Sequence, residues 1–173
     1  MPGTGDNEGF DVARNIKGQY PNIPMVILTP FSHGITKRIA NEDLSPFEYI
    51  FCWLGNTDLL VSIIKLIEDK MNLEHDVNEV GVQTILLVED GIRFYSSILP
   101  NLYKFVLKQS QEFSTEALNA HQRTLRMRGR PKIVLARTYE EAIHIYEKYK
   151  NNILGVITDV RFPRVERGEK DGL

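Results

Sequence analysis

The strongest constraint on the fold of this chain is a short apolar run near its end that stops at an acidic residue. Residues 153–157 read Ile-Leu-Gly-Val-Ile, and Thr158 and Asp159 follow them. A continuous apolar run of this length is typical of a strand that is covered on both faces of a parallel sheet. We therefore expect a buried strand here, with Asp159 at the point where the strand gives way to a loop.

A second apolar run also ends in acidic residues. Residues 85–88 read Ile-Leu-Leu-Val, and Glu89 and Asp90 follow directly. In open α/β sheets, functional sites gather at the carboxyl ends of the strands. If the two strands are neighbours, three carboxylates come close together, which is costly unless a divalent cation or a phosphoryl group uses them. The competing interpretation is that Glu89, Asp90 and Asp159 only terminate strands and cap helices.

Strands and helices alternate along the rest of the chain. Apolar runs predict strands at 25–29, 49–53, 84–88, 132–136 and 153–158, and helical periodicity predicts helices at 11–18, 34–43, 57–70, 92–113 (with Pro100 inside), 114–128 and 139–150. Residues 73–83 are polar without periodicity and are expected to form a linker. This alternation favours a doubly wound α/β fold, in which helices cover a parallel sheet.

Composition bounds the class of protein. The chain has 173 residues, enough for one domain or one and a half, and its formal charge of −2 predicts no general attraction to nucleic acid or to an anionic membrane. Cys52 is the single cysteine, so no internal disulfide can form, and its apolar neighbours predict a core thiol in a reducing compartment. No apolar run reaches the length of a membrane span, and no leader is recognised. A cytoplasmic protein is expected.

Three further groups of residues carry weaker signals. The histidines lack the spacing of metal ligands, so zinc is not expected; they are His33, His75, His121 and His144. A basic run could bind phosphate or RNA, but a solvated helix end is the favoured interpretation; it comprises Arg123, Arg126, Arg128, Arg130 and Lys132. Helix 92–113 is apolar enough either to contact another subunit or to lie in the core of the chain.

The order of the motifs resembles the receiver domain of response regulators with its two halves exchanged. A strand followed by Glu89 and Asp90, and later a strand followed by Asp159, is similar to the first half of a receiver. The segment 1–72 resembles the second half, and Thr29 ends the strand that carries a switch Thr or Ser in receivers. The resemblance implies a flavodoxin-like fold in which Asp159 is the phosphoacceptor. It also implies that Glu89, Asp90 and Asp159 hold Mg²⁺.

Longer stretches resemble the regulatory region of bacterial phosphoenolpyruvate synthase-like proteins, which carry a PEP/pyruvate-binding domain further on. These stretches are 53–56, 64–72, 93–97, 125–132 and 155–163. The resemblance implies that the chain is an internal, non-enzymatic fragment of a phosphotransferase. Its task would be signal transduction in a phosphorelay, with a kinase or phosphotransfer protein as phosphodonor. Residues 1–72 would end one receiver-like unit, 73–83 would be a linker, and 84–173 would begin the next unit.

The exchanged halves can complete one sheet in two ways. The chain could close on itself as a circularly permuted receiver, with strand order 132–136, 84–88, 153–158, 24–29 and 49–53. Alternatively, two chains could exchange halves in a domain-swapped dimer. A homodimer through the helix 92–113 is a further alternative. In each case Thr29 would act as the switch hydroxyl only if the two halves meet.

One departure from the receiver pattern bears on function. Receivers have a Lys after their last strand, but here Cys52, Trp53 and Leu54 occupy that place, and no Lys lies between Arg38 and Lys65. This departure leaves two alternatives to a phosphorylated receiver. The chain could be a degenerate receiver that serves only in dimerisation, or part of an ATP-dependent phosphotransferase that contributes to substrate binding.

Overall fold

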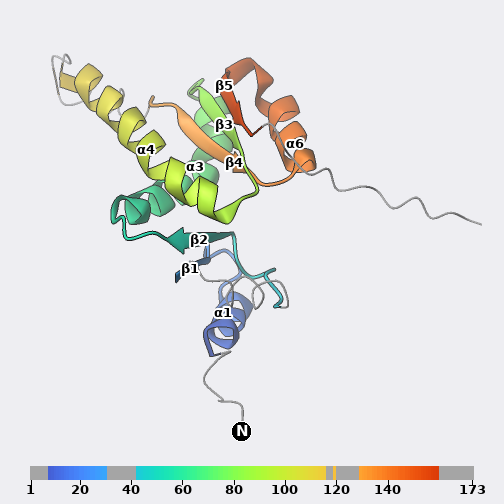
Figure 1. The fold of residues 1–173 in the computed structure, drawn as a ribbon. Helices are drawn as coiled ribbons and strands as arrows, with labels where there is room; N and C mark the ends of the chain where they lie inside the picture. The colour runs from blue at the N-terminus through green and yellow to red at the C-terminus, as the bar shows by residue number, and fades with distance from the viewer. Residues whose placement is uncertain (1–7, 31–41, 116–118, 120–128, 160–173) are drawn as a thin grey trace, which may run out of the picture. The chain divides into compact units, whose positions relative to one another are not determined.

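The computed structural model describes residues 8–30, 42–115, 119 and 129–159. The chain divides into two compact units, Met1–Asn56 and Thr57–Leu173. Both contain parallel strands and helices (Figure 1). The general α/β class expected from the sequence is therefore confirmed, and each unit is described by itself.

The first unit contains one helix and one pair of strands. Helix α1 spans Glu8–Gln19, and the strands β1 (Val26–Pro30) and β2 (Tyr49–Trp53) pair in parallel. Strand β2 is almost wholly buried, whereas β1 is half-buried or exposed along its length. Cys52 is a buried free thiol, as its apolar neighbours predict.

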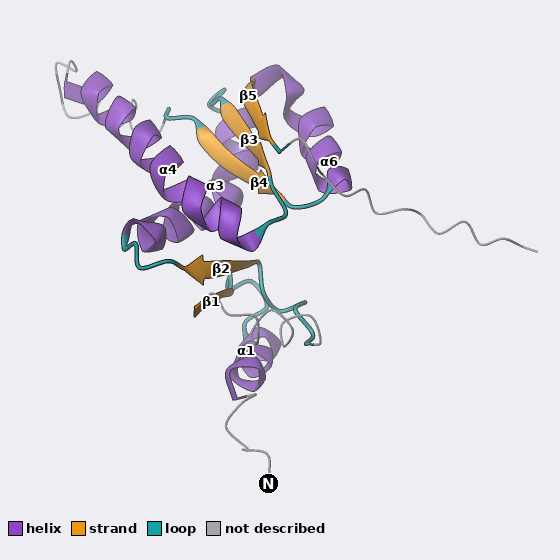
Figure 2. Ribbon diagram, in the orientation of Figure 1, coloured by secondary structure: helices purple, strands orange, loops and turns teal. Residues whose placement is uncertain are grey.

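The second unit contains a three-stranded parallel sheet in the order β4-β3-β5 (Figure 2). Its strands are β3 (Thr84–Val88), β4 (Lys132–Ala136) and β5 (Ile153–Thr158). Its helices are α3 (Asp58–Asn78), α4 (Ile92–Thr115) and α6 (Tyr139–Tyr149), and the short 3-10 helix η1 (Lys150–Asn152) leads into β5. The predicted bounds of all three strands are confirmed.

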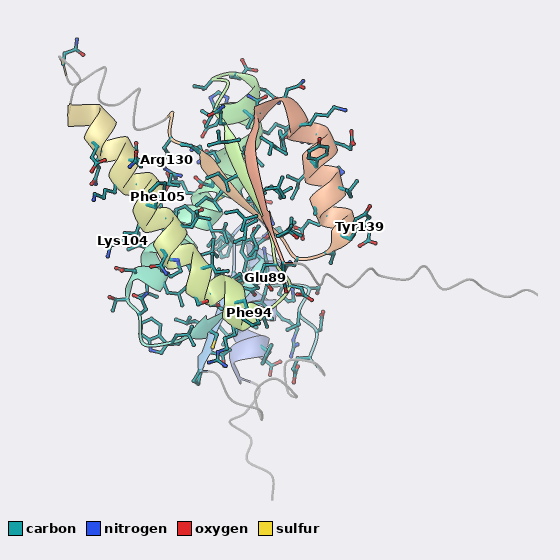
Figure 3. All side chains as sticks on the ribbon, turned by 45° about the horizontal axis from the view of Figure 1, so that its top comes forward. Glu89, Phe94, Lys104, Phe105, Arg130 and Tyr139 are labelled. Atoms are coloured by element: carbon teal, nitrogen blue, oxygen red, sulfur yellow. The ribbon has the colours of Figure 1, made fainter. Side chains whose placement is uncertain are left out.

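Helix α4 runs through Pro100 without a break in the helix. Tyr95, Leu99 and Tyr103 are buried at helical spacing, whereas Phe94 and Phe105 are 63% exposed and are labelled in Figure 3. One face of this helix therefore belongs to the core of its unit, and the opposite face presents two large aromatic side chains. The core alternative describes one face of this helix, and contact with another subunit through the opposite face stays a prediction.

The stretch predicted as a linker is mostly helical. Helix α3 continues to Asn78, because Leu73 and Val77 extend its buried face by two turns. The chain then turns at Gly81, whose φ of 73° lies in the left-handed region that favours glycine. The division between the units consequently falls after Asn56 rather than within 73–83. Residues 34–41 of the predicted helix 34–43 and most of 114–128 lie outside the described residues, and residues 42–43 are not helical.

Strand β5 differs most from expectation, because it is not buried on both faces. Leu154 is 55% exposed and Val156 is 48% exposed. Helix α6 makes its main contacts with β3 and β4, and of the edge strand β5 Ile153 packs against the core clusters. The described strands form two sheets, each in the predicted order, and the predicted pairing of 24–29 with 153–158, which would join the two units, stays a prediction.

The other edge of this sheet is closed by a buried carboxylate on α3. Asp69 is fully buried, and its Oδ2 accepts a hydrogen bond of 3.0 Å from the backbone N–H of Ile133. The backbone N–H of Lys132 donates to the carbonyl of Gln83, the residue before β3. Because successive N–H groups along a strand point to opposite sides, the N–H of Ile133 faces the free edge of β4. Asp69 therefore satisfies a donor that a further strand would otherwise use.

Two cations and a phenol complete the environment of Asp69. Arg130 binds both carboxylate oxygens, with Nη2 at 2.6 Å from Oδ1 and Nη1 at 3.0 Å from Oδ2. The Tyr103 hydroxyl donates to Oδ2 at 3.0 Å, and Lys132 lies 2.7 Å from Asp76. Burial alone would lower the pKa of Arg130, but its hydrogen bonds to Asp69 and the negative charge there raise this pKa overall. Arg130 is thus charged inside the unit.

We expect Asp69→Ala to lower the free energy of unfolding by about 3–5 kcal/mol, because it leaves the buried Arg130 without the carboxylate that it binds, while Lys132 keeps Asp76 as its partner. The milder variant Tyr103→Phe removes a single hydrogen bond to that carboxylate, at a cost of roughly 1.5–3 kcal/mol. Urea unfolding monitored by circular dichroism measures both. The matched control is Asp11→Ala, which breaks an exposed ion pair with Arg14. A control as destabilising as Asp69→Ala would contradict the assignment.

Candidate functional site

The register of the second sheet brings two strand ends with acidic residues side by side. Strands β3 and β5 pair in parallel, and Val88 is the partner of Thr158 at their carboxyl ends. Glu89 follows Val88 directly, and Asp159 follows Thr158. Glu89 and Asp159 therefore lie at the same edge of the sheet, each at the end of one of two neighbouring strands.

Glu89 is the buried member of the group. Its side chain is 7% exposed, and its backbone N–H donates to the carbonyl of Ala136 at 3.0 Å. Its Oε1 accepts a hydrogen bond of 2.9 Å from the N–H of Gly91, immediately before α4 begins. Figure 3 shows Glu89 and Phe94 near this end of the helix. Glu89 thus acts as a helix cap in addition to any part it has in ligand binding.

Asp90 and Asp159 are both exposed, so their carboxylates are open to solvent and to a small ligand. Oxygen donors of this kind suit Mg²⁺. Within the described ranges, however, no three carboxylate, imidazole or thiol groups are close enough together to hold a metal ion. The backbone therefore brings the acids to one edge, and the side chains of Asp90 and Asp159 would have to turn toward Glu89 to form the predicted Mg²⁺ site.

Thr29 lies near the end of β1 in the first unit, as predicted, and its hydroxyl donates to the carbonyl of Pro30 at 3.3 Å. It belongs to a different unit from Glu89, Asp90 and Asp159. Its predicted part as the switch hydroxyl therefore stays a prediction.

A close approach at Gly91 holds the Glu89 carboxylate in place. A Cβ atom at residue 91 would lie 2.9 Å from Oε1 of Glu89 and 2.8 Å from Cδ2 of Phe94. Any larger residue would thus displace the carboxylate, the aromatic ring or both. This close packing at Gly91 was not predicted, although a glycine that follows an acidic pair at a strand end is a sequence signal for a turn.

A second group of charged residues lies at the opposite edge of the same sheet. A cavity of about 560 Å³ is lined there by Lys65, Glu68, Asp76, Ser110, Arg130 and Lys132 among others. Lys65 pairs with Glu68 at 2.7 Å, and Arg130 and Lys132 pair with Asp69 and Asp76. These cations have carboxylate partners within the chain, so the arrangement supports the fold more directly than it supports ligand binding.

The burial of Arg130 and Lys132 corrects the interpretation of the basic run as a solvated helix end. Both residues are at most 6% exposed. The other members of the run, Arg123, Arg126 and Arg128, lie outside the described residues. The sequence feature that indicates this burial is Asp69, an acid on the apolar face of α3 between Leu66 and Leu73. An ionised group on such a face needs a buried partner.

Comparisons with protein-family models, with curated proteins and with solved structures found no match for this chain. Among the described helices, none combines the length and the apolar character that crossing a lipid bilayer requires. The site must therefore be interpreted from its own geometry and chemistry.

We expect Glu89→Ala to lower the free energy of unfolding by about 1 kcal/mol, because it removes an oxygen that caps the start of α4. Glu89→Gln is the matched control, since its amide oxygen can still accept the hydrogen bond from Gly91. Urea unfolding of both variants measures the difference. Equal stability of the two variants would show that the carboxylate does not cap the helix.

Proposed function

We propose that this chain is a receiver-like signalling module that accepts a phosphoryl group on Asp159 with Mg²⁺. The observation that carries the proposal is the register of β3 and β5, in which the strand ends before Glu89 and Asp159 are direct partners. The parallel order β4-β3-β5 supports it, because it places the acids at the carboxyl edge where open α/β sheets bind their ligands.

The chemistry follows from the position of each acid. An oxygen of the exposed Asp159 carboxylate attacks the phosphorus of a phosphodonor, and the bond between phosphorus and the leaving group of the donor breaks. The product is an acyl phosphate on Asp159. When bound at Glu89, Asp90 and Asp159, Mg²⁺ would neutralise the phosphoryl oxygens during the transfer. Glu89, held by Gly91, supplies the one carboxylate whose position is already fixed.

The resemblance of the longer stretches supports a specific setting for this module. The phosphodonor would be a kinase or a phosphotransfer protein of the cytoplasm. The output would be control of attached phosphoenolpyruvate synthase-like domains, with no catalytic turnover by the segment itself. The departure at Cys52, Trp53 and Leu54, where receivers have a Lys, predicts that the response to phosphorylation differs from that of a complete receiver.

A second candidate function is that of a degenerate receiver used only for assembly. The exposed strand β5 favours it, because three apolar residues of this strand are exposed: Leu154, Val156 and Ile157. An edge strand of this kind serves as a template for pairing with another chain. The first function predicts that Asp159 is phosphorylated, and the second predicts that it is not.

We expect incubation of the whole chain with acetyl phosphate and Mg²⁺ to add the mass of one phosphoryl group, measured by intact-protein mass spectrometry. Asp159→Asn should abolish the added mass, and Asp90→Asn should reduce it by at least tenfold because a metal ligand is lost. Asp11→Asn, an exposed aspartate on α1, is the matched control and should be phosphorylated like the unmodified chain.

Two outcomes would count against phosphorylation at this site. Unmodified protein after incubation would favour the assembly function. Phosphorylation that persists in Asp159→Asn would place the acceptor elsewhere. Circular dichroism of each variant shows whether it is folded, so that loss of structure is not mistaken for loss of the acceptor.

A further inference from the structure

The carboxyl edge of the three-stranded sheet carries a cation as well as acids. Strands β3 and β5 are followed by Glu89 and Asp159, whereas β4 is followed directly by Arg137. The central strand β3 pairs with both neighbours, and its last residue, Val88, is level with the last residues of β4 and β5. Arg137 therefore leaves the sheet at the same level as the two acids.

The backbone places Arg137 beside Glu89. The N–H of Glu89 donates to the carbonyl of Ala136 at 3.0 Å, so the hydrogen bonds between β3 and β4 continue to the residue after β3. Val88 and Ala136 pack with helix α6 on one face of the sheet. Because side chains alternate along a strand, the positions of Glu89 and Arg137 belong to the opposite face. The cation and the buried acid are thus neighbours at the edge.

The start of α6 fixes the backbone of Arg137. Its N–H donates to Oε2 of Glu141 at 2.8 Å, and Oγ1 of Thr138, the N-cap residue of α6, accepts the N–H of Glu141 at 3.1 Å. These bonds involve the backbone of Arg137, so they hold the residue at the edge whatever its guanidinium binds. Arg137 is also half-buried, which suits a guanidinium because this group is less strongly hydrated than an ammonium group.

The charge of a phosphorylated site calls for a cation besides Mg²⁺, and this step rests on the proposed function. Glu89 and Asp90 would carry one negative charge each, and the phosphoryl group on Asp159 would carry about two, against the two positive charges of Mg²⁺. An excess of about two negative charges would remain. Helices α4 and α6 both begin at this edge, but their N-termini add only partial positive charge.

We propose that Arg137 binds the phosphoryl group on Asp159 and stabilises its transfer. Strands β4 and β5 flank β3, so the two residues start roughly 10 Å apart, and both side chains and the phosphoryl group extend into this space. The guanidinium donates hydrogen bonds to the phosphoryl oxygens, in the bidentate geometry that arginine forms with phosphate. A cation held in place at the edge meets the negative charge of the transferring group, which lowers the barrier to transfer.

Phosphorylation rates of the whole chain test this role, with acetyl phosphate and Mg²⁺ as reagents and intact-protein mass spectrometry as the measurement. Arg137→Ala should slow the addition of the phosphoryl group by about tenfold, because a charged hydrogen-bond donor is lost. Arg137→Lys keeps the charge but loses the planar pair of donors, so its rate should lie between those of Arg137→Ala and the unmodified chain. The matched control, Lys104→Ala, removes an exposed cation about 18 Å along α4 from the start of that helix and should leave the rate unchanged.

Isothermal titration calorimetry with Mg²⁺ separates an effect of charge from an effect on the fold. Arg137→Ala should bind Mg²⁺ about threefold more tightly than the unmodified chain, because a positive charge close to the metal is removed. This change is opposite in direction to the slower phosphorylation of the same variant. A residue that only supported the fold would weaken both when replaced, so the two measurements together identify the role of the guanidinium.

Several results would overturn the part of Arg137 while leaving the phosphoryl site in place. They are phosphorylation of Arg137→Ala at the rate of the unmodified chain, an equal loss of rate in Lys104→Ala, and a rate of Arg137→Lys no faster than that of Arg137→Ala. Weaker Mg²⁺ binding by Arg137→Ala would also overturn it, since the residue would then act through the fold. An unmodified chain that takes up no phosphoryl group contradicts the proposed function itself, and the part of Arg137 falls with it.

Discussion

The buried carboxylate of Asp69 is the interaction on which the second unit depends. It joins α3 to the edge of β4 through the N–H of Ile133 and gathers the charges of Arg130 and Lys132 around itself. A buried ion pair is weak evidence of net stability, because the cost of removing both charges from water can match their attraction. The clearer effect of the pair is on the arrangement of the elements. The buried carboxylate needs hydrogen-bond donors, and in this fold Arg130 and the backbone N–H of Ile133 supply them.

The two edges of the sheet therefore differ, because a backbone donor at the outer edge of β4 is satisfied by Asp69 and β5 forms the other edge. On the β4 side, a helix takes the place where another strand would add. On the β5 side, Ile153 packs against the core clusters, whereas Leu154, Val156 and Ile157 are exposed. Among the strands that the structure describes, β5 therefore has a strand partner on one side, and the outer side of β4 is occupied by the carboxylate of Asp69. Asp159 follows β5, so the exposed apolar side chains and the acid after its carboxyl end belong to one region of the sheet.

The acidic edge combines one buried acid with two exposed ones. Glu89 is buried and engaged by the N–H of Gly91, whereas Asp90 and Asp159 extend into solvent. Such a division suits a site that admits a cation and a phosphoryl group, since one ligand is already in position and the others can adapt to what binds. The same arrangement of one buried and two exposed acids is also found where the end of a strand caps a helix.

The sequence by itself determined the strands of the second unit and the acids that follow two of them, because five-residue apolar runs and their polar ends are local signals. It also indicated the parallel α/β class through the alternation of strands and helices. Only the tertiary structure decided that residues up to Asn78 continue α3, that Arg130 is buried against Asp69, and that β5 is exposed. Each of these depends on which surfaces meet across long sequence separations, and periodicity within one segment does not contain that information.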